Sequence, residues 1–358
     1  MKIYFPETHR LHNPAFEVFD GGQRVPYLES PERMDRILDA LRKTDWADIE
    51  PPRDFGLDPL RAVHSEEYLA FLASAWTEWL AADPDSPAAA EKIALMPATF
   101  AAKRDQLPET ILGKAGFFLL DLSVPIVEGT YPAALSSANC ALSAAQSISP
   151  SSSFIFPLSS FALCRPPGHH AGREIAGGYC FLNNAAIAAQ WLTRFGTPAL
   201  AGGARGVAIL DVDYHAGNGT QDIFYNRRDV LTISIHADPA FEYPYYAGYV
   251  NETGADDGLG FHHNFPLPAG TDDAAYLPTL DQALALVREF APAHLVVSAG
   301  MDIYEGDPLG RFKITRQGIA EIGRRVAELG LPTAITMEGG YNTDALGENV
   351  AAFLENFV

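Results

Sequence analysis

The chain has 358 residues, 47% of them hydrophobic, so it can bury a large core, and its formal net charge is −20. A field of that sign repels nucleic acid and attracts small cations such as amines, although a plain acidic surface that aids solubility explains it equally well. No signal-peptide pattern opens the chain and no apolar run could span a bilayer. We therefore expect a cytoplasmic protein without a membrane or nucleic-acid partner.

Three stretches of the chain look irregular. Residues 81–115 hold the run Asp83-Pro84-Asp85-Ser86-Pro87 and further scattered prolines, which predicts a long loop that serves as a lid or an interface. Residues 147–153 form a Ser/Pro-rich connection. Residues 241–264 crowd aromatics, glycines and acids together, as a pocket-lining loop does.

The rest of the central and C-terminal chain alternates strand-like and helix-like patterns. Short β-branched or aliphatic runs predict strands at 161–165, 207–211, 230–235, 294–299 and 333–337. Helical periodicity predicts helices at 182–195, 275–290 and 316–329. This alternation is typical of βαβ units, and no repeat or dividing linker is present. We expect an α/β fold with a mostly parallel sheet in a single domain.

Polar residues follow four of the predicted strands directly. The strand at 161–165 leads to His169 and His170, and the strand at 207–211 leads to Asp211, Asp213 and His215. The strand at 294–299 leads to Asp302, and the strand at 333–337 leads to Tyr341. In open α/β sheets, chemistry collects at the carboxyl ends of the strands. Core packing requires none of these residues, so their recurrence at one end of the sheet predicts an active site.

Asp213 and His215 lie two residues apart on extended chain, so their side chains share one face and can hold one ion. Carboxylate and imidazole suit zinc, and a catalytic zinc takes three protein ligands with one position left for water. Asp302 would complete that set, although a helix N-cap is an equal alternative for it. The three cysteines follow no Cys-x-x-Cys spacing, so a thiolate site is not indicated.

The adjacent His169 and His170 can handle protons, one as general base toward water and the other as its partner. Such imidazoles donate their second N–H to a carboxylate or amide, and Asp211 and Asn218 are the candidates. Tyr341 follows two glycines, and its phenol could stabilise an oxyanion. Together these parts describe metal-assisted amide hydrolysis.

Five motifs resemble the arginase/deacetylase superfamily in type and in order. They are Arg165-Pro-Pro-Gly-His-His170, Gly177-Gly-Tyr-Cys-Phe-Leu-Asn-Asn184, Asp211-Val-Asp-Tyr-His-Ala-Gly-Asn-Gly219, Ser298-Ala-Gly-Met-Asp302 and Glu338-Gly-Gly-Tyr341. The likeness runs from about residue 30 to residue 342. The resemblance implies a mainly parallel eight-stranded sheet and one Zn²⁺ on Asp213, His215 and Asp302.

The same resemblance assigns further roles. His169 would be the general base, His170 its electrostatic or acid partner, and Tyr341 the group that polarises the scissile carbonyl. A structural K⁺ is also implied, at a site that matches Asp211, Asp213, His215, Ser234 and Ile235. Arg36 falls where the family has an arginine lining an acetate-release channel.

Within the superfamily, the segment from Pro6 to Pro14 and the run from Ile235 to Pro239 look like those of bacterial acetylpolyamine amidohydrolases. The segment 81–115 resembles the insertion by which those enzymes form homodimers and narrow their entrance. The implied substrate is a small cationic acetylated amine. The residues expected to line its site, besides Arg36, are Asp121, Gly178, Tyr179 and Tyr243.

Some of these assignments have alternatives. The acid that grips a distal ammonium in one such enzyme aligns with Ser123, two residues after Asp121, so Asp121 could equally be an ordinary surface acid. Tyr179 and Tyr243 could be plain core. Three other functions are possible interpretations of the whole chain. They are a histone-deacetylase-like enzyme for acetyl-lysine proteins, a binuclear manganese ureohydrolase, and a binding protein that has lost activity.

Overall fold

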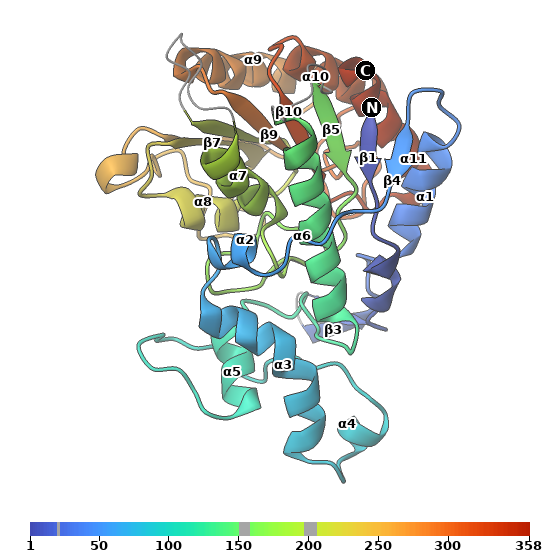
Figure 1. Cartoon of the computed structure of the whole chain (residues 1–358), viewed down its shortest axis with the longest axis vertical. Coiled ribbons are helices and arrows are strands. Elements are labelled where there is room, and N and C mark those ends of the chain that lie inside the picture. The colour runs from blue at the N-terminus through green and yellow to red at the C-terminus, as the bar shows by residue number, and fades with distance from the viewer. Residues whose placement is uncertain (20–21, 150–157, 197–205) are drawn as a thin grey trace.

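The computed structural model describes residues 1–19, 22–149, 158–196 and 206–358, and its centre is a sheet of eight strands (Figure 1). Every pairing in that sheet is parallel, so the expected α/β architecture is confirmed. The strand order is β4-β1-β5-β10-β9-β6-β7-β8. The bounds are β1 (Lys2–Tyr4), β4 (Asp48–Glu50), β5 (Ser159–Ala162), β6 (Val207–Asp211), β7 (Val230–Ala237), β8 (His262–Leu267), β9 (His294–Ala299) and β10 (Thr333–Met337).

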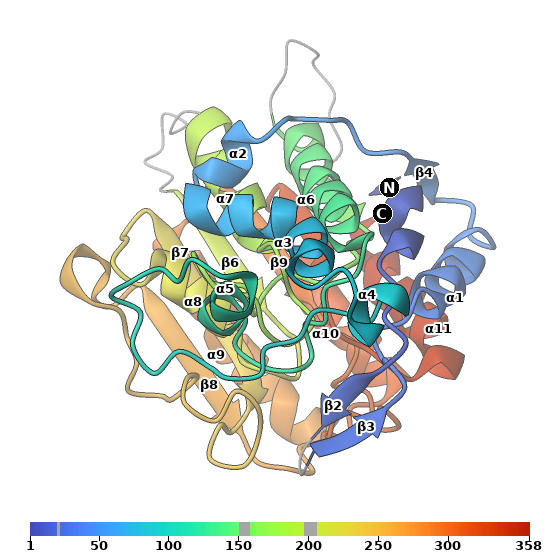
Figure 2. The same ribbon diagram turned by 90° about the horizontal axis from the view of Figure 1, so that it is seen from below.

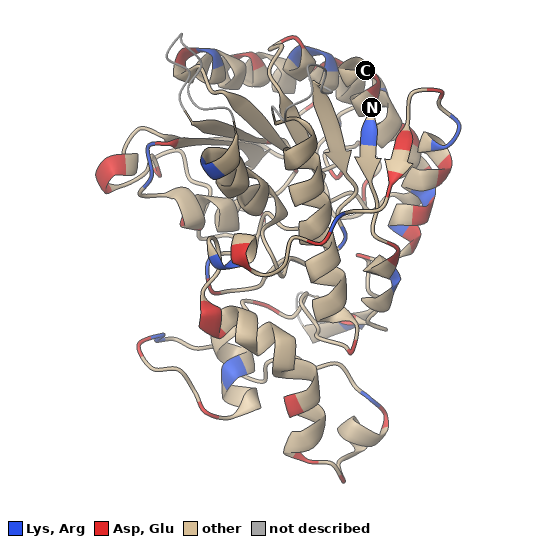
Figure 3. Ribbon diagram, viewed as in Figure 1, with Lys and Arg blue, Asp and Glu red and all other residues tan. Residues whose placement is uncertain are grey.

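The inner strands form because their sequences are apolar on both faces, as a covered parallel sheet requires. Every residue of β6, β9 and β10 is buried, and these strands have the bounds that the sequence predicts. β5 ends at Ala162, earlier than expected, and β7 continues to Ala237. Charged residues lie mainly on the outer helices and loops, whereas the middle of the sheet carries few (Figure 3).

Helices cover both faces of the sheet (Figure 2). Val207 and Ile209 of β6 belong to the core beneath one helical layer, and Ala208 and Leu210 to the core beneath the other, because alternate strand residues face opposite ways. The first layer consists of α6 (Thr130–Ser147) and α7 (Asn184–Phe195), and α3 (Glu66–Ala82) and α5 (Ile111–Phe118) continue its core into the projecting end of the molecule. The second contains α1 (Glu32–Leu41), α9 (Asp273–Phe290), α10 (Arg316–Ala327) and α11 (Thr343–Leu354).

The described chain also contains smaller elements. A two-stranded antiparallel sheet pairs β2 (Glu17–Phe19) with β3 (Gln23–Val25), α2 (Asp58–Arg61) precedes α3, and α8 (Asn218–Phe224) follows β6. The three helices expected from periodicity correspond to α7, α9 and α10, with ends shifted by a few residues. No helix in the described part of the chain is long and apolar enough to cross a membrane.

The segment 81–115 is not wholly a loop. It contains the single turn α4 (Pro87–Ala90) and the first residues of α5, with irregular chain between them. Together with α3 it projects from the end of the molecule away from the termini (Figure 1). The Ser/Pro-rich connection at 147–153 lies mostly outside the described residues.

Candidate active site

The carboxyl ends of β6 and β9 bring three candidate metal ligands together. These two strands are neighbours in the sheet, and the ligand atoms of Asp213, His215 and Asp302 all lie within 4.8 Å of one another. The Nδ1 atom of His215 is 3.3 Å from Asp213 Oδ1 and 3.1 Å from Asp302 Oδ2. Backbone N–H groups hold the outer carboxylate oxygens, since Gly339 donates to Asp213 Oδ2 and Tyr214 to Asp302 Oδ1.

This donor set fits a zinc ion. Asp213 and Asp302 are fully buried, and two buried carboxylates side by side require a positive charge. Burial raises the pKa of Asp302 to about 7, and the neighbouring Asp213 adds to the rise. Burial opposes a charge on His215, but the two carboxylates outweigh it and raise its pKa to about 10. Without a metal, a proton on His215 therefore balances the negative charge of the two carboxylates, as a bound cation would. Two carboxylate oxygens and one imidazole nitrogen form a ligand set that suits zinc.

A second cluster of potential ligands lies close by, formed by His169, Cys180 and Glu338. Most of its donor atoms already have partners. His169 Nδ1 bonds to Asp211, Glu338 Oε2 accepts from two backbone N–H groups, and the Cys180 thiol donates to Gly178 O at 3.3 Å. Burial also raises the pKa of the Cys180 thiol well above its usual value, which disfavours the thiolate that binds metal. We assign the metal position to the Asp213, His215 and Asp302 set.

The two adjacent histidines differ in their hydrogen-bond partners. His169 Nδ1 lies 2.9 Å from Asp211 Oδ2, and His170 Nδ1 lies 2.7 Å from Asn218 Oδ1, as the sequence predicts. Burial lowers the pKa of both rings. For His169 the carboxylates of Asp213 and Asp211 more than reverse this, and its pKa lies well above the ordinary value. His170 faces a neutral amide and other imidazoles, so its pKa lies well below.

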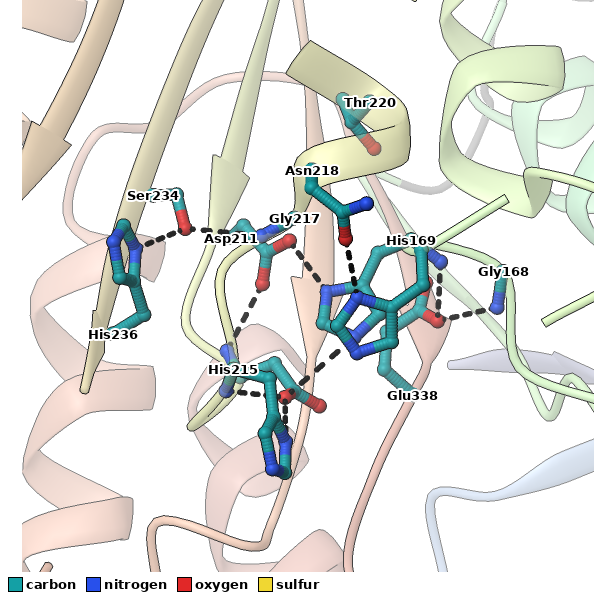
Figure 4. A network of polar contacts seen from close by, with 12 residues as sticks. Gly168, His169, Asp211, His215, Gly217, Asn218, Thr220, Ser234, His236 and Glu338 are labelled. Carbon is teal, nitrogen blue, oxygen red and sulfur yellow. Dashed lines mark hydrogen bonds and ion pairs between the residues drawn. The ribbon is translucent and has the colours of Figure 1, made fainter. Parts of the chain in front are cut away.

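Glu338 positions the turn that carries these histidines, a role that the sequence did not suggest. Its Oε2 atom accepts hydrogen bonds from the backbone N–H of Gly168 at 2.6 Å and of His169 at 3.1 Å (Figure 4). Burial raises the pKa of Glu338 to about 7. The only hint in the sequence is its place just before the Gly-Gly-Tyr motif at the end of β10.

Tyr341 is held on two sides. Asp307 Oδ2 accepts the backbone N–H of Tyr341 at 2.6 Å, and the guanidinium of Arg33 lies 4.8 Å from the centre of the Tyr341 ring. Arg33 is fully buried and donates to the carbonyl oxygens of Gly340 and Glu338, both at 2.6 Å. Asp307 and Arg33 are further positioning residues, and the sequence patterns did not predict their roles.

The structure corrects the placement of Arg36. Its side chain is about half exposed on α1, where it pairs with Glu32 at 2.9 Å. Arg36 therefore lies apart from the other site residues. Arg33, one turn earlier on the buried face of the same helix, is the arginine behind Tyr341.

A cavity of about 710 Å³ opens onto the site. Its lining includes His169, His170, His215, Tyr341 and the expected substrate residues Asp121, Gly178, Tyr179 and Tyr243. Phe100 of the projecting segment and the charged pair Glu242 and Arg311 also line it. A groove of about 810 Å³ beside it is larger, but of the site residues only Asn218 borders it. The chemistry therefore belongs to the smaller cavity.

The residues expected at a potassium site also lie together. Asp211 pairs with Ser234 in the register of β6 and β7, and Ile235 follows on β7. Asp211 Oδ1 accepts the backbone N–H of Asp213 at 3.0 Å, and Ser234 Oγ lies 2.7 Å from His236 Nδ1 (Figure 4).

Comparison with known proteins identifies the family of the chain. The family described as the histone deacetylase domain matches residues 27–357. Acetylpolyamine amidohydrolase 2 of Pseudomonas aeruginosa is 42% identical over 100% of this chain and 98% of its own, and the acetylpolyamine amidohydrolase of Mycoplana ramosa is 40% identical over 99% of each.

Solved structures give the same result. The acetylpolyamine aminohydrolase from Burkholderia pseudomallei superposes with a TM-score of 0.91 at 40% identity, covering 100% of this chain and 98% of the other. The HD domain of HDA15 gives a TM-score of 0.76 at 27% identity, covering 100% and 90%. The resemblance inferred from the motifs, and with it the amide-hydrolysing deacetylase class, is confirmed. The chain belongs to the histone deacetylase family.

Proposed function

We propose that the protein is a zinc-dependent deacetylase that hydrolyses N-acetylated polyamines or similar small acetylated amines. One observation carries the chemistry: a metal-ligand set, a carboxylate-paired histidine and a tyrosine hydroxyl line one cavity. The names of the relatives at 40–42% identity support the substrate class.

Asp213, His215 and Asp302 would hold the zinc ion, which supplies Lewis acidity toward the amide carbonyl and lowers the pKa of water. His169 accepts a proton from the attacking water, and Asp211 on its Nδ1 stabilises the resulting imidazolium. The Tyr341 hydroxyl donates a hydrogen bond to the carbonyl oxygen as negative charge develops there.

His170 acts as the electrostatic or acid partner of His169. The centres of the two rings are 4.0 Å apart, so a charge on one affects the other strongly. Because Asn218 Oδ1 can only accept, the His170 Nδ1 atom carries a hydrogen and its Nε2 is the basic atom. His169 then returns the proton that it accepted from water to the leaving amine, so that acetate and a free amine are the products.

The cavity suits a slender cationic chain. Tyr179 and Tyr243 supply aromatic faces that favour methylenes and an ammonium, and Glu242 supplies negative charge in the lining. The net charge of −20 adds a long-range attraction for amines.

The same proposal includes a homodimer and a structural potassium ion. Phe100, Leu107 and Leu112 of the projecting segment are exposed apolar side chains, and we infer that a second copy of the chain covers them in a homodimer. We also infer that Asp211, Asp213, His215, Ser234 and Ile235 hold a structural K⁺. Sedimentation that shows only monomer would reject the first inference, and a melting temperature indifferent to replacing Na⁺ by K⁺ would reject the second.

A substrate panel tests the proposal. The zinc-loaded chain should release acetate from N-acetylputrescine and N-acetylcadaverine with a kcat/KM at least tenfold higher than for acetyl-lysine peptides. The reverse preference would assign the enzyme to acetyl-lysine proteins instead.

A further inference from the structure

Asp121 connects the two parts of the chain that supply the aromatic walls of the cavity, Tyr179 and Tyr243. Its Oδ2 atom accepts hydrogen bonds from the backbone N–H of Gly178 at 2.8 Å and from the Tyr243 hydroxyl at 2.7 Å. Its Oδ1 atom accepts the backbone N–H of Ser123 at 2.9 Å. We propose that Asp121 is a positioning residue that fixes the width of the substrate cavity, and is not the acid that binds the substrate ammonium. This inference rests on the proposed function for its meaning in catalysis.

The carboxylate continues a short parallel pairing between two distant segments. The backbone N–H of Ala176 donates to Phe118 O at 2.8 Å, and the backbone N–H of Leu120 donates to Ala176 O at 2.8 Å. Gly178 N–H comes next, and the Asp121 side chain accepts it in place of a backbone carbonyl. Asp121 thus fixes the turn before Tyr179 to the chain that follows α5.

That turn is strained and packs against the catalytic residues. Gly178 and Tyr179 both have positive φ, +50° and +70°, which a tyrosine rarely adopts. A Cβ added at Gly178 would lie 2.2 Å from His170 Cδ2, so the turn cannot move toward that ring. The Tyr179 ring centre is 5.5 Å from that of Tyr341. Any movement of the turn therefore reaches His170 and Tyr341.

The opposite wall depends on the same carboxylate. The Tyr243 ring meets His170 edge to face at 4.9 Å and His215 at 6.2 Å. A Cβ added at Gly177 would lie 3.0 Å from the Tyr243 hydroxyl oxygen, so the glycine leaves the phenol room to reach Asp121. Both walls are thereby tied to one carboxylate and to the histidines.

The geometry favours positioning over ammonium binding. A carboxylate offers roughly four acceptor sites, and groups of the protein itself occupy three of them. A substrate ammonium would have to compete with donors that are already well placed.

Paired substrates separate the two roles. Steady-state kinetics would compare N-acetylputrescine with its neutral isostere N-pentylacetamide, in the variants Asp121→Asn and Tyr243→Phe. Matched controls are Asp54→Asn, which changes an exposed carboxylate that accepts the Gly56 N–H at 2.9 Å, and Tyr131→Phe on α6. We expect kcat to fall about tenfold for both substrates in both test variants, because misplacement affects any substrate equally. A loss confined to N-acetylputrescine and expressed in KM would overturn the inference.

A second readout needs no turnover. Hydrogen exchange of the backbone amides in residues 176–180 should become faster in Asp121→Asn and Tyr243→Phe and stay unchanged in the controls. Unchanged exchange in both test variants would also overturn the inference. If the wild-type chain hydrolyses neither amide, the proposed function fails, and the exchange rates still decide whether Asp121 positions the turn.

Discussion

The Nδ1 atom of His169 lies 2.9 Å from Asp211 Oδ2, and both side chains are almost completely buried. The Nε2 atom of the same ring lies 3.6 Å from Asp213 Oδ1, next to the metal position. One nitrogen is therefore bonded to a carboxylate, and in the proposed mechanism the other nitrogen would face the reacting water. This arrangement gives His169 the basicity that a proton acceptor needs.

Replacing Asp211 by Asn should weaken that base. The carboxylate raises the pKa of His169, so its removal lowers that pKa and moves the acid limb of the kcat/KM profile to lower pH. The maximal rate should fall about 10- to 100-fold. A pH–rate profile with substrate in excess of zinc-loaded enzyme measures both effects, and an acid limb that stays in place would contradict the assignment.

Tyr341→Phe should remove one hydrogen bond from the transition state and little else. We expect kcat to fall about 100- to 1,000-fold with KM almost unchanged, as for other oxyanion donors. Tyr131→Phe, remote from the cavity, is the control for the loss of a phenol hydroxyl. If KM rises while kcat holds, Tyr341 would be a binding residue only.

Arg33 and Arg36 should respond very differently to truncation. Arg33→Ala leaves the buried Glu29 with one guanidinium fewer and should destabilise the chain by about 3 kcal/mol or more. Arg36→Ala breaks an exposed pair and should change stability by less than about 0.5 kcal/mol. Urea unfolding of the two variants makes the comparison, and equal losses would show that the buried network carries little stability.

The stability of the metal-free chain should fall as pH rises. The pKa of His215 is about 10 in the folded chain, against roughly 6.5 when unfolded. The folded chain thus keeps a proton that the unfolded chain releases, so this stabilisation is complete below about pH 6.5 and is lost toward pH 10. In the proposed holoenzyme, zinc would replace that proton.

Melting temperatures between pH 7 and pH 9 measure this effect. They should decline more steeply without zinc than with it, because groups outside the metal position titrate alike in both forms. Parallel curves for the two forms would contradict the assigned ligand set.

Local sequence patterns were sufficient for the inner strands and for the ligands. β6, β9 and β10 are mainly aliphatic runs with a polar residue or glycine at or next to each end, so their ends are visible in the sequence. β1 and β4 have three residues each and carry too little pattern to detect. β8, at the edge of the sheet, contains two histidines and an asparagine and does not read as a buried strand.

The positioning residues were harder to find because their partners are distant along the chain. Glu338 and Gly168 are 170 positions apart, and Asp121 and Tyr243 are 122 apart, so only the folded sheet brings them together. Arg33 is different. It shares a helical face with Ile37 and Leu41, at four-residue spacing, and that periodicity distinguishes it from Arg36.

Acetate release during a zinc titration tests the central claim most directly. Metal-free protein would be titrated with Zn²⁺ while acetate released from N-acetylputrescine is measured. We expect no release without metal, a linear rise, and a break at one ion per chain, with the rise absent in Asp302→Asn. A break at two ions per chain, or no acetate at any ratio, would contradict a mononuclear deacetylase of small acetylated amines.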